Sequence, residues 1–110
     1  MPSLLAQLKQ HSVVVADTGD LAAIGRFQPE DATTNPSIIL KALQAGQYQR
    51  QVDHALRQAM ASGISVPAII ADACDRLVVS MGVEILAAIS GKVSTEVPAA
   101  LSFNTAATLA

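Results

Sequence analysis

Short strand-forming runs alternate with longer stretches of helical periodicity, and this alternation constrains the fold more than any other feature of the sequence. A strand is indicated by a short β-branched or apolar run closed by turn residues, and a helix by apolar residues at every third or fourth position. Strands are expected at 13–16, 32–35 and 92–97, and helices around 4–8, 21–26, 36–45, 48–60, 67–90 and 106–110. Because strands joined through helices pair in parallel, the sequence predicts an α/β fold with helices packed on a parallel sheet.

The composition is typical of a protein interior. Hydrophobic residues make up 51% of the 110 residues and charged residues only 15%, against roughly 25% charged residues in an ordinary globular protein. This composition excludes a disordered chain, which needs low hydrophobicity and high charge. A small free-standing domain should expose much polar surface. We therefore expect the chain either to oligomerise or to be a piece of something larger.

Charge and apolar patterning narrow the classes of partner. The net charge is -2 and no basic stripe is present, which argues against nucleic acid as a partner. No apolar run approaches the roughly 20 residues that a membrane helix needs, and the first residues lack the features of a secretory signal. The sequence thus indicates neither a nucleic-acid nor a membrane partner.

The long helix expected at 67–90 carries one apolar face. The single cysteine, Cys74, lies on it, cannot form an internal disulfide, and is expected to act as a small buried apolar residue. A lone cysteine fits a reducing compartment, so we expect a cytoplasmic location. The apolar stripe expected to face the core consists of Ile70, Ala73, Leu77, Met81 and Ile85.

Three polar residues lie at or near the carboxyl ends of the three expected strands: Asp17, Asn35 and Glu96. In parallel α/β folds this edge of the sheet is where functional sites are built. Strand parity puts Thr33 on the same side as Asn35, and Ser94 on the same side as Glu96. Asp17 and Asn35 taken singly are equally typical of turn and capping residues. The coincidence on three strands favours a shared site.

Other motifs argue against common cofactors. No glycine-rich phosphate or dinucleotide motif is present, and His11 and His54 are isolated from each other, which predicts no metal site. Asp17-Thr18-Gly19 after an apolar run is also the mark of dimeric retroviral-type aspartic proteases, in which two aspartates share a proton. Those proteases are almost wholly β, whereas helical periodicity covers more than half of this chain. We therefore disfavour the protease interpretation.

Three segments carry a resemblance to a known family. They are 14–20 (Val-Ala-Asp-Thr-Gly-Asp after the first valine), 31–37 (Asp-Ala-Thr-Thr-Asn-Pro-Ser) and 93–97 (Val-Ser-Thr-Glu-Val). Together, in this order and spacing, they resemble transaldolase, and the middle segment resembles the amino-terminal signature of that family. The resemblance runs from about Leu4 to the last residue.

The resemblance implies the amino-terminal part of a (β/α)8 TIM-type barrel and a transferase of the pentose phosphate pathway. Such enzymes carry a dihydroxyacetone unit from sedoheptulose 7-phosphate to glyceraldehyde 3-phosphate, which gives erythrose 4-phosphate and fructose 6-phosphate. The chemistry implied uses a lysine Schiff base, with no metal and no organic cofactor. The implied partner is a sugar phosphate.

The resemblance also implies roles for residues at the strand ends. Asp17 is implied as the acid/base for the C4 hydroxyl, and Glu96 as a residue acting through a water in imine formation and hydrolysis. Asn35 is implied to orient the dihydroxyacetone moiety, and Thr33 to line the substrate pocket.

The Schiff-base lysine of the family lies on a fourth strand, which this chain does not reach. Lys9, Lys41 and Lys92 are instead expected to be solvated surface charges. An eight-stranded barrel takes about 250 residues, so residues 1–110 are expected to be one partial barrel, truncated before the fourth strand and inactive alone. Three alternatives stay open: a non-catalytic remnant, an interaction module, and one half of a split enzyme. Self-association or a complementing chain would accompany them.

Overall fold

The computed structural model describes residues 1–62 and 65–110. Three strands form one parallel sheet in the order β1-β2-β3, with β1 at Val15–Asp17, β2 at Asp31–Thr34 and β3 at Val93–Thr95. The predicted α/β architecture is confirmed. No other described segment pairs with β1 or β3, so the sheet is open at both edges, as in a segment of a parallel α/β barrel.

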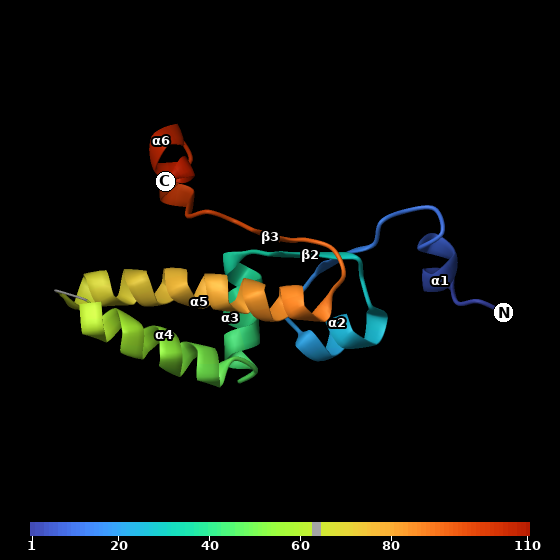
Figure 1. Cartoon of the computed structure of the whole chain (residues 1–110), viewed down its shortest axis with the longest axis horizontal. Coiled ribbons are helices and arrows are strands. Elements are labelled where there is room, and N and C mark those ends of the chain that lie inside the picture. Colours follow the sequence, from blue (N-terminus) through green and yellow to red (C-terminus); the bar gives the residue numbers. More distant parts are fainter. Residues whose placement is uncertain (63–64) are drawn as a thin grey trace.

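The helices lie where the periodicity predicts them. They are α1 (Leu4–Leu8), α2 (Leu21–Phe27), α3 (Pro36–Gln44), α4 (Gln49–Ser62), α5 (Val66–Ala88) and α6 (Thr105–Leu109), with a short 3-10 turn at Ala99–Leu101. Figure 1 shows α4 and α5 side by side beneath the sheet, and α6 standing away from both.

Polar caps determine where these helices begin. The side chains of Ser3, Asp20, Asn35, Ser65 and Asn104 each accept a hydrogen bond from a backbone N–H in the first turn of the helix that follows. These bonds satisfy donors that have no partner within the helix. The helix starts are therefore encoded locally, which is why the sequence predicts them well.

The first and third strands are shorter than predicted, and β2 has the predicted length but begins one residue earlier. The carbonyl of Val14 accepts from the amide of Glu30 at 2.9 Å, and within residues 1–62 and 65–110 no strand pairs with the residues before Val14. At the other end, Thr34 is the last residue of β2 and pairs with Thr95, which leaves Glu96 just beyond β3.

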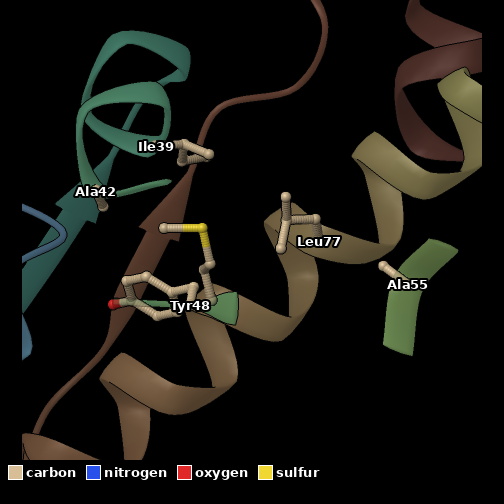
Figure 2. Packing of buried hydrophobic residues seen from close by; sticks show 6 residues of the cluster. Ile39, Ala42, Tyr48, Ala55 and Leu77 are labelled. Carbon is tan, nitrogen blue, oxygen red and sulfur yellow. The ribbon is translucent and has the colours of Figure 1, made fainter. Parts of the chain in front are cut away.

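Two apolar clusters hold the helices to each other and to the sheet. One joins α3, α4 and α5, and Figure 2 shows Tyr48 and Leu77 pointing into it together with residues of α3. The other joins Ile24 of α2 and Ile85 of α5 to Ala32 of β2. The helices therefore cover one face of the sheet, the face that bears Ala16, Ala32 and Val93.

Two predictions about α5 are wrong. Cys74 is exposed, because the buried stripe runs through Ala73, Leu77, Met81 and Ile85, and Cys74 is rotated by one residue away from it. Ile70 is also exposed, since the buried stripe starts only at Ala73. None of the described helices combines the length and apolar character needed to cross a bilayer.

The molecule is more open than a free-standing domain of its size. Its radius of gyration is 16.3 Å, against about 13 Å for a compact chain of this length. Its accessible surface is 7761 Å², against roughly 5,800 Å² for a folded monomer of this mass. The interior-like composition thus has a structural counterpart: much of the apolar surface is uncovered.

The turn before β3 lies directly against the start of β2. The amide of Gly91 donates to the carbonyl of Glu30 at 2.8 Å, and the amide of Lys92 donates to the Asp31 carboxylate at 2.8 Å. A Cβ on Gly91 would lie 2.5 Å from the Glu30 carbonyl oxygen and would overlap the Asp31 carboxylate. Only glycine permits this approach.

Gly91→Ala is therefore expected to lower the free energy of unfolding by about 1–3 kcal/mol, because the inserted methyl forces β2 and β3 apart. Gly25→Ala is the matched control, since a Cβ there meets nothing within 4 Å. That variant should be neutral or more stable by about 0.5–1 kcal/mol. Urea unfolding followed by far-ultraviolet circular dichroism measures both, and equal effects would contradict the assignment.

Tyr48 anchors the loop that follows β1. Its side chain is 1% exposed, and its hydroxyl donates to the carbonyl of Gly19 at 2.8 Å. Gly19 also packs closely on α3, where an added Cβ would lie 3.1 Å from the Cβ of Ala42. The segment between Asp17 and α2 is thereby held against the helical layer. Burial, and next the charges of Glu84 and Asp20, raise the pKa of Tyr48 to about 12.

Tyr48→Phe should cost about 1–3 kcal/mol of stability near neutral pH, because the buried Gly19 carbonyl loses its donor. The parent should also lose stability as the pH rises from about 10 to about 12, since the unfolded tyrosine ionises near 10.0 and the folded one resists ionisation. Urea unfolding across this range should show the variant without that additional decline. A parallel decline in both proteins would contradict the role given to Tyr48.

Candidate functional site

Asp17 and Thr33 meet at the carboxyl edge of the sheet. Asp17 is the last residue of β1 and stands opposite Thr33 of β2 in the strand register. The Thr33 hydroxyl donates to Oδ1 of Asp17 at 2.9 Å. Two of the predicted site residues are therefore in direct contact.

The sheet face that carries Asp17 is the one that the helices leave uncovered. Alternation along β2 buries Ala32 and Thr34 under the helices and turns Thr33 to the other side. In β3, Ser94 stands opposite Thr33 in the register. Asp17, Thr33 and Ser94 thus form a polar row across three strands, on the side that would face inward in a closed barrel.

Asn35 caps a helix through its side-chain oxygen and still has its NH₂ group available as a hydrogen-bond donor. It follows β2 directly and is the N-cap of α3, where its Oδ1 accepts from the amide of Ile38 at 2.9 Å. Since the backbone amide is a donor, the oxygen of the Asn35 side chain must face it, and the NH₂ group remains available. The capping interpretation and the site interpretation of Asn35 are therefore compatible.

Glu96 lies immediately after β3, at the same edge of the sheet. It is exposed and is the next residue after Ser94 with the same strand parity. Pro98 follows it closely and opens the 3-10 turn. The structure thus brings Asp17 and Thr33 into contact, with Asn35 directly after β2 and Glu96 directly after β3.

The three lysines lie elsewhere. Lys41 is exposed on α3, and Lys92 precedes β3, at the amino end of that strand. Lys9 was expected to be only a solvated charge, but its ammonium donates to the carbonyls of Phe27 and Gln28 at 2.8 and 2.7 Å. It caps the end of α2, where Gln28 has φ of 48° and leaves those carbonyls exposed.

The protease interpretation of Asp17-Thr18-Gly19 is excluded by the fold. The hydroxyl of Thr18 accepts from the amide of Asp20 at 3.1 Å, and the Asp20 carboxylate caps α2. The motif therefore joins a parallel strand to a helix. Over residues 1–62 and 65–110, no group of three or more histidine, cysteine or acidic side chains is arranged to hold a metal ion.

A hollow on the opposite side of the sheet was not predicted. It lies between α5 and β3 and is lined mainly by apolar residues, among them Val79, Val83, Leu86 and Val93. None of Asp17, Asn35 and Glu96 lines it, so it is distinct from the polar row. The spacing of Val79, Val83 and Leu86 on the helix was a signal for a second apolar face that sequence reasoning did not use.

Comparison with known proteins agrees with these features. Residues 14–110 match the model of the transaldolase/fructose-6-phosphate aldolase family. Transaldolase from Shewanella sp. (strain ANA-3) is 51% identical over 104 residues, which are 94% of this chain and 33% of that protein. Transaldolase from Thermosynechococcus vestitus is 56% identical over 110 residues, 97% of this chain and 28% of that protein.

The chain spans about a third of the length of these relatives, while the family match covers nearly all of the chain. By that match, the chain belongs to the transaldolase/fructose-6-phosphate aldolase family.

Proposed function

We propose that this chain is the amino-terminal part of a transaldolase barrel, and that it supplies the proton-handling side of the active site. The reaction is transfer of a dihydroxyacetone unit from sedoheptulose 7-phosphate to glyceraldehyde 3-phosphate. The observation that carries the proposal is the contact of Asp17 with Thr33 on the uncovered face, with Asn35 and Glu96 at the neighbouring strand ends.

The chemistry requires an acid/base group and an electron sink. Cleavage of the bond between C3 and C4 of the ketose leaves an electron pair on C3, which an imine at C2 accepts far better than a ketone does. Asp17 takes the proton of the C4 hydroxyl as that bond breaks. Glu96 acts through a water when the imine forms and is hydrolysed.

Asn35 orients the three-carbon unit in this proposal. Its Oδ1 is held by the amide of Ile38 at 2.9 Å, so its NH₂ group donates to an oxygen of the substrate. A side chain fixed by a backbone contact loses little freedom when the substrate binds, which favours the positioning of reactants. The cap of α3 thus serves the site as well as the helix.

The electron sink comes from outside residues 1–110 in our proposal. Lys9 caps α2, Lys41 lies on α3, and Lys92 precedes β3, so none of the three lies at the carboxyl end of a strand. A lysine on a later strand of a complete barrel supplies the imine. We propose a cytoplasmic location, as the single cysteine and the pathway suggest.

The partners in this proposal are a sugar phosphate and the remaining strands of the barrel. In the described part of the chain both edges of the sheet are unpaired, and the apolar hollow between α5 and β3 offers a surface for the next strand and helix. The remaining strands come either from a longer form of the same chain or from a separate complementing chain.

Chain 1–110 alone should form no imine with substrate. The test is incubation with fructose 6-phosphate and borohydride, followed by intact mass spectrometry and mapping of each lysine. We expect no increase in mass, because no lysine adjoins the polar row. A reduced three-carbon or six-carbon adduct on any of the three lysines would contradict this prediction.

Co-expression with the remaining two thirds of a transaldolase relative should restore turnover. In that complex, Asp17→Asn should lower kcat by about 10²–10⁴-fold, the usual contribution of general acid–base catalysis. Lys41→Arg is the control, since Lys41 is exposed on α3 and should leave turnover unchanged. If the two co-expressed chains do not turn over substrate, the proposal that a separate chain can complete the barrel is wrong.

A non-catalytic interaction module is the second candidate, favoured by the exposed apolar residues Val79, Val83 and Leu86. Size-exclusion chromatography with light scattering and calorimetric unfolding separate the two. A cooperative monomer with a normal heat-capacity change would favour a genuine small module. Aggregation or an ensemble without cooperative unfolding would favour a barrel fragment that needs its other strands.

A further inference from the structure

We infer that Thr33 is a positioning residue for Asp17 and not a donor to the substrate. The inference deepens the proposed function and rests on it, because it concerns the carboxylate that receives the proton. The sequence predicts only that Thr33 lines the pocket. The contact between the two side chains gives Thr33 a narrower and different role.

The number of hydrogen bonds that the Thr33 hydroxyl can donate determines this role. A threonine hydroxyl has one hydrogen, and that of Thr33 is donated to Oδ1 of Asp17 at 2.9 Å. Toward a substrate, the Thr33 oxygen can therefore only accept. For Asp17, Oδ1 accepts this bond while Oδ2 accepts none from the described residues, so Oδ2 is the less engaged oxygen and the one we assign to take the C4 hydroxyl proton.

The strand register makes the contact specific. Asp17 and Thr33 are direct partners in the parallel pairing of β1 and β2, so their side chains leave the same face next to each other. Ser94 is the partner of Thr33 on the other side and lies one strand further from Asp17. Of the two hydroxyls in the row, Thr33 is the one beside the carboxylate.

The other polar side chains near Asp17 form hydrogen bonds with backbone amides. The Thr18 hydroxyl accepts from the amide of Asp20 at 3.1 Å, and Oδ1 of Asn35 accepts from the amide of Ile38 at 2.9 Å. Among the described residues, Thr33 is the side chain that donates to Asp17. Because Asp17 is exposed, loss of this donor leaves its carboxylate free to rotate.

The test is nuclear magnetic resonance of the isotopically labelled chain 1–110, both alone and in the co-expressed complex with the unlabelled remaining strands. Thr33→Val removes the hydroxyl with little change of volume, Thr33→Ala removes it with a smaller side chain, and Thr33→Ser keeps it. Ser94→Ala is the matched control, since it removes the other hydroxyl of the row. The readouts are the Asp17 carboxyl ¹³C shift and the three-bond couplings that report its χ1 rotamer.

Both variants without a hydroxyl should shift the Asp17 carboxyl signal and move its couplings toward rotamer-averaged values. Thr33→Ser should restore the parent values, and Ser94→Ala should not change them. A purely structural role of Thr33 would disturb backbone amide shifts along β2 and leave the Asp17 rotamer intact.

Unchanged couplings in Thr33→Val and Thr33→Ala, or a Thr33→Ser variant that behaves like them, would overturn the positioning role. These readouts need no turnover, so they remain measurable if the proposed reaction is wrong. Conversely, a complemented enzyme that is active while Thr33→Val leaves Asp17 ordered would refute this inference and keep the proposed function.

Discussion

One apolar stripe on α5 holds the structure together. Leu77 and Met81 pack in the cluster with α3 and α4, and Ile85 packs in the cluster with α2 and the sheet. Burying each of these side chains contributes about 1.5–3 kcal/mol, which a helix needs because helical propensity alone stabilises it little. A single face of one helix thus joins both cores. The strength of the sheet's attachment to the helical layer depends on it.

That one-sided packing also determines which face of the sheet is available for a candidate site. The helices bury the side chains of β2 that alternate with Thr33, so the face with Asp17, Thr33 and Ser94 carries no helix. Parallel pairing then aligns the strand ends at one edge. The site follows from the sheet's parity and direction, while Tyr48 secures the loop beyond Asp17 through the Gly19 carbonyl.

The sequence predicts what is local and periodic. Capping residues such as Asp20 and Asn35 correctly predicted where α2 and α3 begin. Strand parity correctly placed Asp17 and Thr33 on the same face of the sheet. The sequence does not predict contacts between segments that are far apart along the chain. The bond from Tyr48 to Gly19 does not follow from periodicity, because it depends on how elements far apart in sequence pack. The hydrogen bond between Thr33 and Asp17 was not predicted for the same reason. Strand parity determines which face of the sheet a side chain occupies, but not which residue of the neighbouring strand it stands beside. The exposure of Cys74 does follow from periodicity, since Cys74 lies one residue off the predicted stripe.

The low charge of the chain is explained by helix α5, which is apolar on two opposite faces. Opposite the buried stripe, Val79, Val83 and Leu86 are 65%, 60% and 48% exposed. They border β3, whose outer edge pairs with no other strand among the residues that the structure describes. An exposed helix face would normally carry charged residues, and an exposed strand edge would normally be protected. Both departures fall on the same side of the sheet, so a further strand and helix added there would cover them together. The composition is therefore that of a layer packed on more than one side, while the polar row lies on the face of the sheet that the helices leave uncovered.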